Sequence, residues 1–212
     1  MKLYAISGLG ADHRVFQQLK LGYELVPIVW LKPKVKETIT AYAIRLAQKI
    51  NTNEKFAIMG VSFGGLIAIE ISKILNPVLT ILISSAETKS ELRTIYSIIG
   101  KSKLLQLMPN MFFDPPRIIA NWLFGTKEKK LLNDILNDTD LNFAKWAVIE
   151  LLNWQNDEKL YKPILKIAGT KDKLIPPKKD NKTKLIKNGE HFMIVDCAAE
   201  ISDIINEALN KV

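Results

Sequence analysis

The chain has 212 residues, 48% of them hydrophobic, and a formal net charge of +8, which supports one domain with a sizeable core. The basic residues include only four arginines and are scattered along the chain, which favours a solvated surface over a nucleic-acid-binding face. The single cysteine (Cys197) excludes an internal disulfide, and two histidines leave little material for a metal site, so no metal is expected. No secretory signal or membrane-length apolar window occurs, so we expect a soluble cytoplasmic protein without a membrane partner.

The first half of the chain predicts alternating strands and helices. Short apolar runs favour strands at residues 3–7, 24–30, 55–61 and 78–84. Between them, helices are expected over residues 12–19, 38–50 and 64–75, the first two with Asp12 and Thr38 as N-caps. The continuous apolar run at residues 78–84 is typical of a strand covered on both faces in a parallel sheet.

Residues 86–155 break this rhythm. They are rich in Leu, Ile, Phe and Trp at helical spacing, contain no clear strand, and are interrupted at Pro109, at Pro115 and Pro116, and at Gly125. Strands are expected again at residues 163–169 and 183–186, followed by an amphipathic helix over 198–211. The sequence therefore predicts one α/β domain over residues 1–212, a three-layer sandwich around a mainly parallel sheet of about six strands, with residues 86–155 inserted as a helical lid.

The strongest chemical signal is Gly60-Val61-Ser62-Phe63-Gly64, followed by Gly65, between an apolar strand and an amphipathic helix. A serine hydroxyl can act as a nucleophile when it projects from a sharp strand-to-helix turn, and glycines on both sides remove the Cβ clashes of such a turn. We therefore interpret Ser62 as a nucleophile.

With this motif the sequence resembles the α/β-hydrolase family over nearly its full length. That family orders its triad as nucleophile, acid and histidine, and the resemblance implies Asp172, in the stretch Gly169 to Pro176, as the acid and His191 as the base. Glu87 remains an alternative acid, because some relatives carry it after the strand that follows the nucleophile helix. His13 is a rival base, but it falls near the first loop, where the family places oxyanion donors.

The first loop, Ser7-Gly8-Leu9-Gly10, resembles the family's oxyanion turn, which implies the backbone amides of Leu9 and Phe63 as donors. Ser7 stands where relatives often carry histidine. A dinucleotide-binding reading of Gly8-x-Gly10 is disfavoured, because its third small residue would be His13 and no ribose-binding acid follows, so no cofactor is expected. The antiparallel hairpin with which many relatives open is expected to be missing.

The resemblance implies a serine hydrolase that cleaves a carboxylic ester or thioester of a small, largely apolar substrate. The substrate pocket is expected to include Trp122, Phe143, Trp146 and Met193. Lid lysines could dock an acidic acyl carrier protein: Lys101, Lys103, Lys127, Lys129 and Lys130. Three alternative functions remain: a non-catalytic small-molecule-binding member of the fold, and an acyltransferase or a cofactor-free haloperoxidase with the same triad. The sequence is compatible with a monomer or a homodimer.

Overall fold

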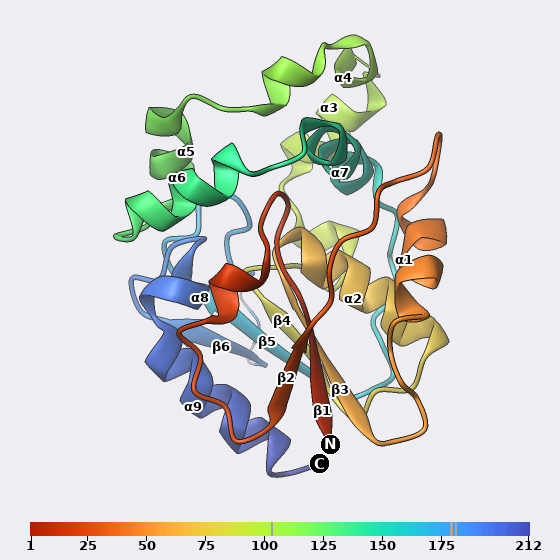
Figure 1. The fold of residues 1–212 in the computed structure, drawn as a ribbon, viewed down its shortest axis with the longest axis vertical. Coiled ribbons are helices and arrows are strands. Elements are labelled where there is room, and N and C mark those ends of the chain that lie inside the picture. The colour runs from red at the N-terminus through yellow and green to blue at the C-terminus, as the bar shows by residue number, and fades with distance from the viewer. Residues whose placement is uncertain (103, 179, 181) are drawn as a thin grey trace.

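The fold is built on a six-stranded sheet in the order β2-β1-β3-β4-β5-β6 (Figure 1). The computed structural model describes residues 1–102, 104–178, 180 and 182–212, and every strand pairing among them is parallel. The strands are β1 (Lys2–Ile6), β2 (Glu24–Pro27), β3 (Phe56–Val61), β4 (Thr80–Ile83), β5 (Ile164–Gly169) and β6 (Thr183–Ile186). The predicted α/β class and parallel sheet are confirmed, and the described sheet contains no antiparallel hairpin.

Helices cover both faces of the sheet, which gives the predicted three layers. Helices α1 (Ile39–Ala47) and α2 (Phe63–Ile74) pack on one face, and the short α8 (Met193–Asp196) and α9 (Ala198–Leu209) on the other. The alternation of strand β1 shows why both faces need a cover, because Tyr4 and Ile6 belong to the first core and Leu3 and Ala5 to the second.

The helix expected over residues 12–19 is shorter than predicted. The structure has only the 3-10 helix η1 (His13–Phe16), which Asp12 caps by accepting a hydrogen bond from the Arg14 amide at 2.9 Å. Further along, the amide of Lys20 donates to Ser202 of α9 at 2.9 Å. After η1 the backbone amide of Lys20 is therefore satisfied by a side chain distant in the sequence, and not by a further helical turn.

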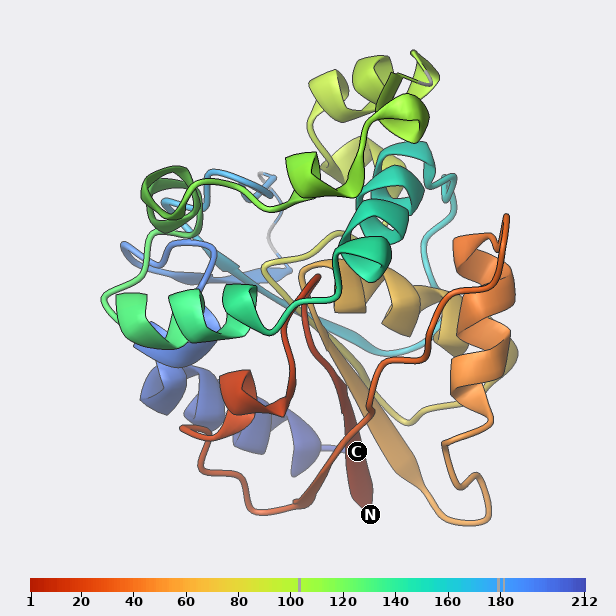
Figure 2. The ribbon, with the colours of Figure 1, turned by 45° about the horizontal axis from the view of Figure 1, so that its top comes forward.

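The predicted insertion is present between β4 and β5 and is helical throughout its regular parts. It lies over the carboxyl ends of the strands (Figure 2) and contains η2 (Lys89–Glu91), α3 (Thr94–Lys101), α4 (Leu104–Leu107), η3 (Asn110–Phe113), α5 (Arg117–Phe124), α6 (Lys129–Asn137) and α7 (Leu141–Asn153). The predicted breaks recur: Pro116 immediately precedes α5, and Gly125, with a left-handed φ of 62°, ends it. None of the described helices has the length and apolar character needed to span a bilayer.

The two ends of the insertion are joined to each other where they leave the sheet. The Lys89 amide donates to the Asn156 carbonyl at 2.7 Å, and the Asn156 side-chain amide donates to the Glu87 carbonyl at 2.7 Å. Next to this neck, the buried Trp154 indole donates to Glu70 of α2 at 2.9 Å. The two ends of the insertion therefore leave and re-enter the sheet layer at one hydrogen-bonded neck.

Candidate active site

Ser62 occupies the sharp turn between β3 and α2 that the sequence predicts. Its φ of 52° and ψ of −123° lie outside the common regions for a residue with a side chain. The turn is crowded, because a Cβ at Gly60 would collide with the Gly64 carbonyl and one at Gly64 with the Ser7 carbonyl. The two glycines of the motif therefore allow the backbone approach that holds this strained serine in place.

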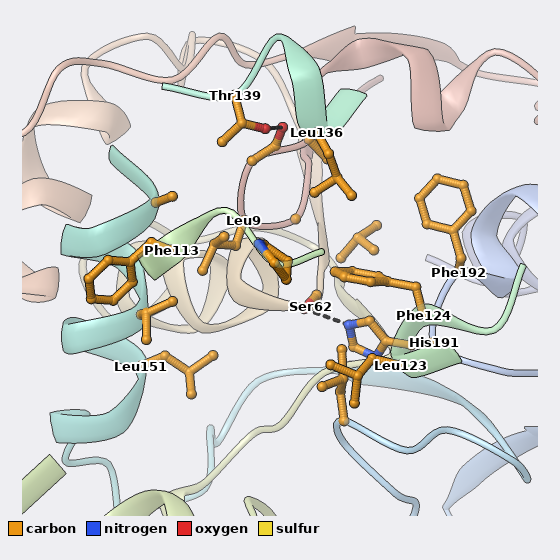
Figure 3. Close-up of a pocket in the computed structure, with 18 of the residues that line it drawn as sticks. Leu9, Ser62, Phe113, Leu123, Phe124, Leu136, Thr139, Leu151, His191 and Phe192 are labelled. Atoms are coloured by element: carbon orange, nitrogen blue, oxygen red, sulfur yellow. Dashed lines mark hydrogen bonds between the residues drawn. The ribbon is translucent and has the colours of Figure 1, made fainter. Parts of the chain in front are cut away.

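Ser62, His191 and Asp172 form one hydrogen-bonded chain. His191 Nε2 lies 2.8 Å from Ser62 Oγ, and His191 Nδ1 lies 2.8 and 2.9 Å from the two carboxylate oxygens of Asp172. With the neutral ring protonated at Nδ1, that nitrogen donates to Asp172 and Nε2 can accept the Ser62 proton. The structure thus brings the three predicted residues together, as Figure 3 shows for Ser62 and His191.

The Asp172 carboxylate is buried and is held by backbone donors as well as by the histidine. It accepts the amides of Leu174 at 2.9 Å and Ile175 at 2.8 Å. These bonds fix the carboxylate and compensate its loss of water. Tyr96, from α3 of the insertion, donates in turn to the Leu174 carbonyl at 2.8 Å, and burial raises the pKa of its phenol, so it remains a neutral donor.

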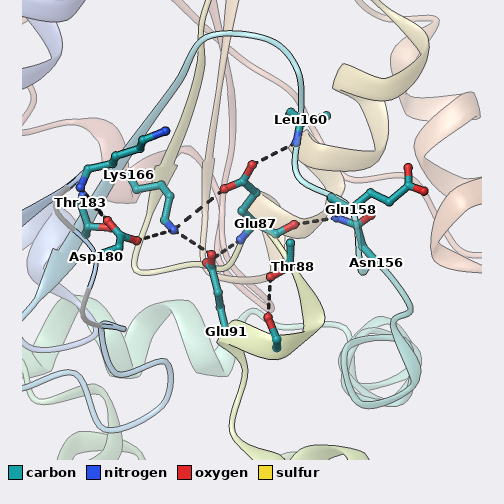
Figure 4. A network of polar contacts seen from close by, with 11 residues as sticks. Glu87, Thr88, Glu91, Asn156, Glu158, Leu160, Lys166, Asp180 and Thr183 are labelled. Atoms are coloured by element: carbon teal, nitrogen blue, oxygen red, sulfur yellow. Dashed lines mark hydrogen bonds and ion pairs between the residues drawn. The ribbon is translucent and has the colours of Figure 1, made fainter.

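The two rival residues are placed elsewhere. Glu87 accepts the Leu160 amide at 3.0 Å and lies 4.0 Å from Lys166, in a network with Glu91 and Asp180 (Figure 4). His13 is exposed on η1. The histidine that bonds Ser62 is therefore paired with Asp172 and not with Glu87.

The predicted oxyanion loop, Ser7-Gly8-Leu9-Gly10, approaches Ser62 closely. A Cβ at Gly8 would lie 3.4 Å from the Cβ of Ser62, and within the described residues the Leu9 amide has no protein acceptor. Ser7, which differs from the family pattern, holds the loop by donating its hydroxyl to the Ala11 carbonyl at 2.7 Å, and it accepts the Trp30 indole at 2.9 Å. The loop is thus supported without the histidine.

A cavity of about 260 Å³ opens beside Ser62 and His191 (Figure 3). Its wall is mostly apolar and comes from both the sheet side and the insertion. The insertion contributes Phe113, Leu123, Phe124, Leu136, Leu141, Val148 and Leu151, and the sheet side contributes Leu9, Val15, Val61, Leu174, Ile175, Phe192 and Ile194. Such a site favours binding of an apolar group next to the serine.

None of the four residues expected in the pocket lies among those that line this cavity. Trp122 is 63% exposed and stacks under Lys173, while Met193 is fully buried in the second core. Phe143 packs against Trp30, with ring centroids 4.9 Å apart, and Trp146 packs against Tyr42, with ring centroids 4.4 Å apart.

The expected residues of α5 and α7 miss the cavity because other faces of these helices line it. Helix α5 presents Leu123 and Phe124 rather than Trp122, and α7 presents Val148 and Leu151 rather than Trp146. The spacing of apolar residues contains no signal that distinguishes these faces. Sequence reasoning also missed Tyr96 and the lid residue Thr139, described below.

The lid lysines proposed for carrier docking are surface residues. Lys101, Lys127, Lys129 and Lys130 are exposed, and Lys103 lies outside the described residues. Within the part of the chain that the structure describes, no three His, Cys, Asp or Glu side chains gather in a metal-binding group.

No protein-family model matches the sequence, and no curated protein matches it. Solved structures do match over nearly the whole chain. A thermophilic esterase from Thermogutta terrifontis superposes with a TM-score of 0.72 at 13% identity, covering 100% of this chain and 90% of the esterase. The chain has the α/β-hydrolase fold. 

Other proteins similar to this α/β-hydrolase-fold chain have related names. A lipase-esterase related protein from Clostridium acetobutylicum has a TM-score of 0.69 at 16% identity, with 97% of this chain and 93% of that protein covered. A thioesterase from the prodiginine biosynthetic pathway of Streptomyces coelicolor has a TM-score of 0.65 at 14% identity, with 95% and 84% covered. At these identities the likeness establishes the α/β-hydrolase fold and leaves activity to be argued from the site.

Proposed function

We propose that this chain is a serine hydrolase that cleaves a carboxylic ester or thioester of a small, largely apolar substrate. The observation that carries the proposal is the strained Ser62, with its hydroxyl oxygen 2.8 Å from His191 Nε2 at the wall of an apolar cavity. A serine that contacts a buried histidine, which in turn contacts a buried carboxylate, is the arrangement that activates a hydroxyl for attack on a carbonyl.

In the proposed reaction, Ser62 Oγ bonds to the carbonyl carbon as its proton passes to His191 Nε2. The Leu9 and Phe63 amides stabilise the oxyanion. The phenylalanine amide belongs to the first residue of α2, which has no partner within the helix. Collapse of the tetrahedral intermediate expels the alcohol or thiol, which takes the proton from His191, and leaves an acyl-serine. Water, deprotonated by the same ring, then releases the acid.

The preference for an apolar acyl group follows from the size and lining of the cavity. A cavity of about 260 Å³ lies just below the usual range for small-molecule pockets, so it suits a small acyl group. Because carbon side chains form most of its wall, a charged acyl group would lose its hydration without gaining partners. The esterases and the thioesterase among the similar structures agree with this class of substrate.

The test is labelling by a fluorophosphonate, followed by hydrolysis of p-nitrophenyl esters of two to ten acyl carbons. We expect the wild type to be labelled and to turn over medium acyl esters, and Ser62→Ala to lose both while keeping its circular dichroism spectrum. Ser90→Ala, which removes an exposed serine hydroxyl, serves as the matched control. A folded wild type that neither labels nor hydrolyses any ester would overturn the proposal in favour of a binding protein.

A further inference from the structure

The turn between α6 and α7 of the insertion contacts the oxyanion loop directly. The Thr139 hydroxyl oxygen lies 2.9 Å from the Gly10 carbonyl and 2.9 Å from the Ile135 carbonyl (Figure 3). A hydroxyl has one proton, so Thr139 donates either to the loop or to its own helix. The approach is close: a Cβ at Gly10, where φ is 71°, would lie 2.8 Å from the Thr139 hydroxyl.

A second polar contact joins the same two segments. Arg14, on η1 just after the loop, donates to Asp138 at 2.8 Å and also pairs with Asp12. The Asp138 side chain is 65% exposed, so water and salt screen this ion pair and its contribution is small. The Thr139 bond, which is partly buried, is therefore the stronger of the two links.

The loop is held from two sides. On the inner side, Ser7 and Trp30 both donate to the Ala11 carbonyl, at 2.7 and 3.1 Å. On the outer side, Thr139 holds the Gly10 carbonyl. The Gly10 carbonyl shares a peptide plane with the Ala11 amide, which donates to the Gly8 carbonyl at 3.0 Å, and the Gly8 carbonyl shares a plane with the Leu9 amide, the proposed oxyanion donor. A shift of the Gly10 carbonyl is therefore passed to the Leu9 amide through this one hydrogen bond.

We propose that Thr139 is a positioning residue that holds the oxyanion loop in its productive geometry from the α6–α7 turn of the insertion. The inference rests on the proposed function. If the α6–α7 turn moves away, the Thr139 proton passes to the Ile135 carbonyl, four residues earlier, and no donor is left unpaired. Thr139 therefore has an alternative acceptor within its own helix, and its bond to the loop depends on the position of the α6–α7 turn.

The experiment compares Thr139→Val, which keeps the shape and removes the hydroxyl, with Thr139→Ser, which keeps the hydroxyl. On the best p-nitrophenyl ester we expect Thr139→Val to lower kcat by about tenfold to a hundredfold with KM changed less than twofold, since a misaligned oxyanion donor acts on the transition state. Thr139→Ser is expected to keep most of the wild-type kcat. The matched control is Thr126→Val, which removes an insertion hydroxyl that contacts Asp196 instead.

Hydrogen exchange of the segment 8–14 supplies a readout that needs no activity. We expect its amides to exchange several times faster in Thr139→Val than in the wild type or in Thr139→Ser. Wild-type kcat and wild-type exchange in Thr139→Val would overturn the positioning role, as would an equal loss in both threonine variants. Failure of the proposed function looks different, because the wild type itself would then neither label nor hydrolyse esters while the exchange comparison still tests the contact.

Discussion

Ser85 donates its hydroxyl to the backbone carbonyl of Ser62 at 2.7 Å, so the segment after β4 holds the strained turn that carries the nucleophile. We expect Ser85→Ala to lower kcat for ester hydrolysis about tenfold, because the turn relaxes and shifts Ser62 relative to His191. The free energy of unfolding should fall by about 1 kcal/mol, the usual net value of one hydrogen bond. Kinetics and urea denaturation measure the two effects. Ser90→Ala is the control, and equal kinetics in the two variants would contradict the role of Ser85.

The acid of the triad can be tested by two isosteric changes. Asp172→Asn is expected to lower kcat by about four orders of magnitude, because an amide facing Nδ1 favours the wrong histidine tautomer. Glu87→Gln should stay within about twofold of the wild type, since Glu87 contacts Leu160 and Lys166 rather than His191. Measuring kcat on one ester decides between them. A larger loss in Glu87→Gln would reassign the acid.

The length of the bound acyl chain should depend on the insertion side of the cavity. Phe113 and Leu151 lie together on one side of it, away from His191 (Figure 3). We expect Phe113→Ala to shift the ester profile toward longer chains, by about fourfold in kcat/KM per added methylene that becomes buried, from about 0.8 kcal/mol each. Trp122→Ala removes an exposed ring outside the cavity and should leave the profile unchanged. Identical profiles for both variants would show that the acyl group binds elsewhere.

The buried Lys166 of β5 is the positive centre of the network in Figure 4. It lies 2.8 Å from Glu91 and 3.0 Å from Asp180. Lys166→Met leaves carboxylates without their cation, and we expect a loss of about 3 to 5 kcal/mol in the free energy of unfolding at pH 7. The loss should be smaller at pH 5, because crowded carboxylates protonate more readily. Thermal melting at both pH values measures this, and an equal loss at both would argue against a charge effect.

The same network predicts how the wild type responds to acid. Burial alone would raise the pKa of Asp180, but the hydrogen bonds from Lys166 and two backbone amides outweigh it and hold the pKa below its usual range. A carboxylate with a lowered folded pKa stabilises the protein above its unfolded pKa of 3.8 and loses that contribution as the pH falls below this value. Melting temperatures of the wild type should therefore drop below about pH 4 more steeply than those of Asp180→Asn.

Patterns that act within a few residues predicted the sheet and the arrangement around Ser62. The apolar runs predicted the strands, and the glycines around Ser62 predicted its sharp turn at the end of β3. The roles of Asp172 and His191 followed from the resemblance to the α/β-hydrolase family, and both residues lie in loops after parallel strands, whose carboxyl ends meet at one edge of the sheet.

Contacts between distant segments limited the prediction elsewhere. The side chain of Thr139 reaches Gly10 across 129 residues, and no spacing rule connects them. Likewise, Trp122 and Leu123 are adjacent and both apolar, but only the packing of α5 decides that the leucine lines the cavity. The hydrophobic pattern of an insertion indicates that its helices are amphipathic. It does not indicate which neighbour each helix face contacts.

The closed neck at Lys89 and Asn156 brings the two ends of the insertion together beside β4 and β5, so the register of these strands does not depend on the length of chain between them. Strands β4 and β5 are held in register by their own pairing, and the chain between them leaves and returns at the one hydrogen-bonded neck. Because loop-closure entropy grows only slowly with length, insertions of very different size could be carried on the same neck at little cost to the sheet. An exchanged insertion would still have to supply the contacts that this one makes with the rest of the chain, such as Ile135 in the second core, Phe143 in the first and Tyr96 with the Leu174 carbonyl.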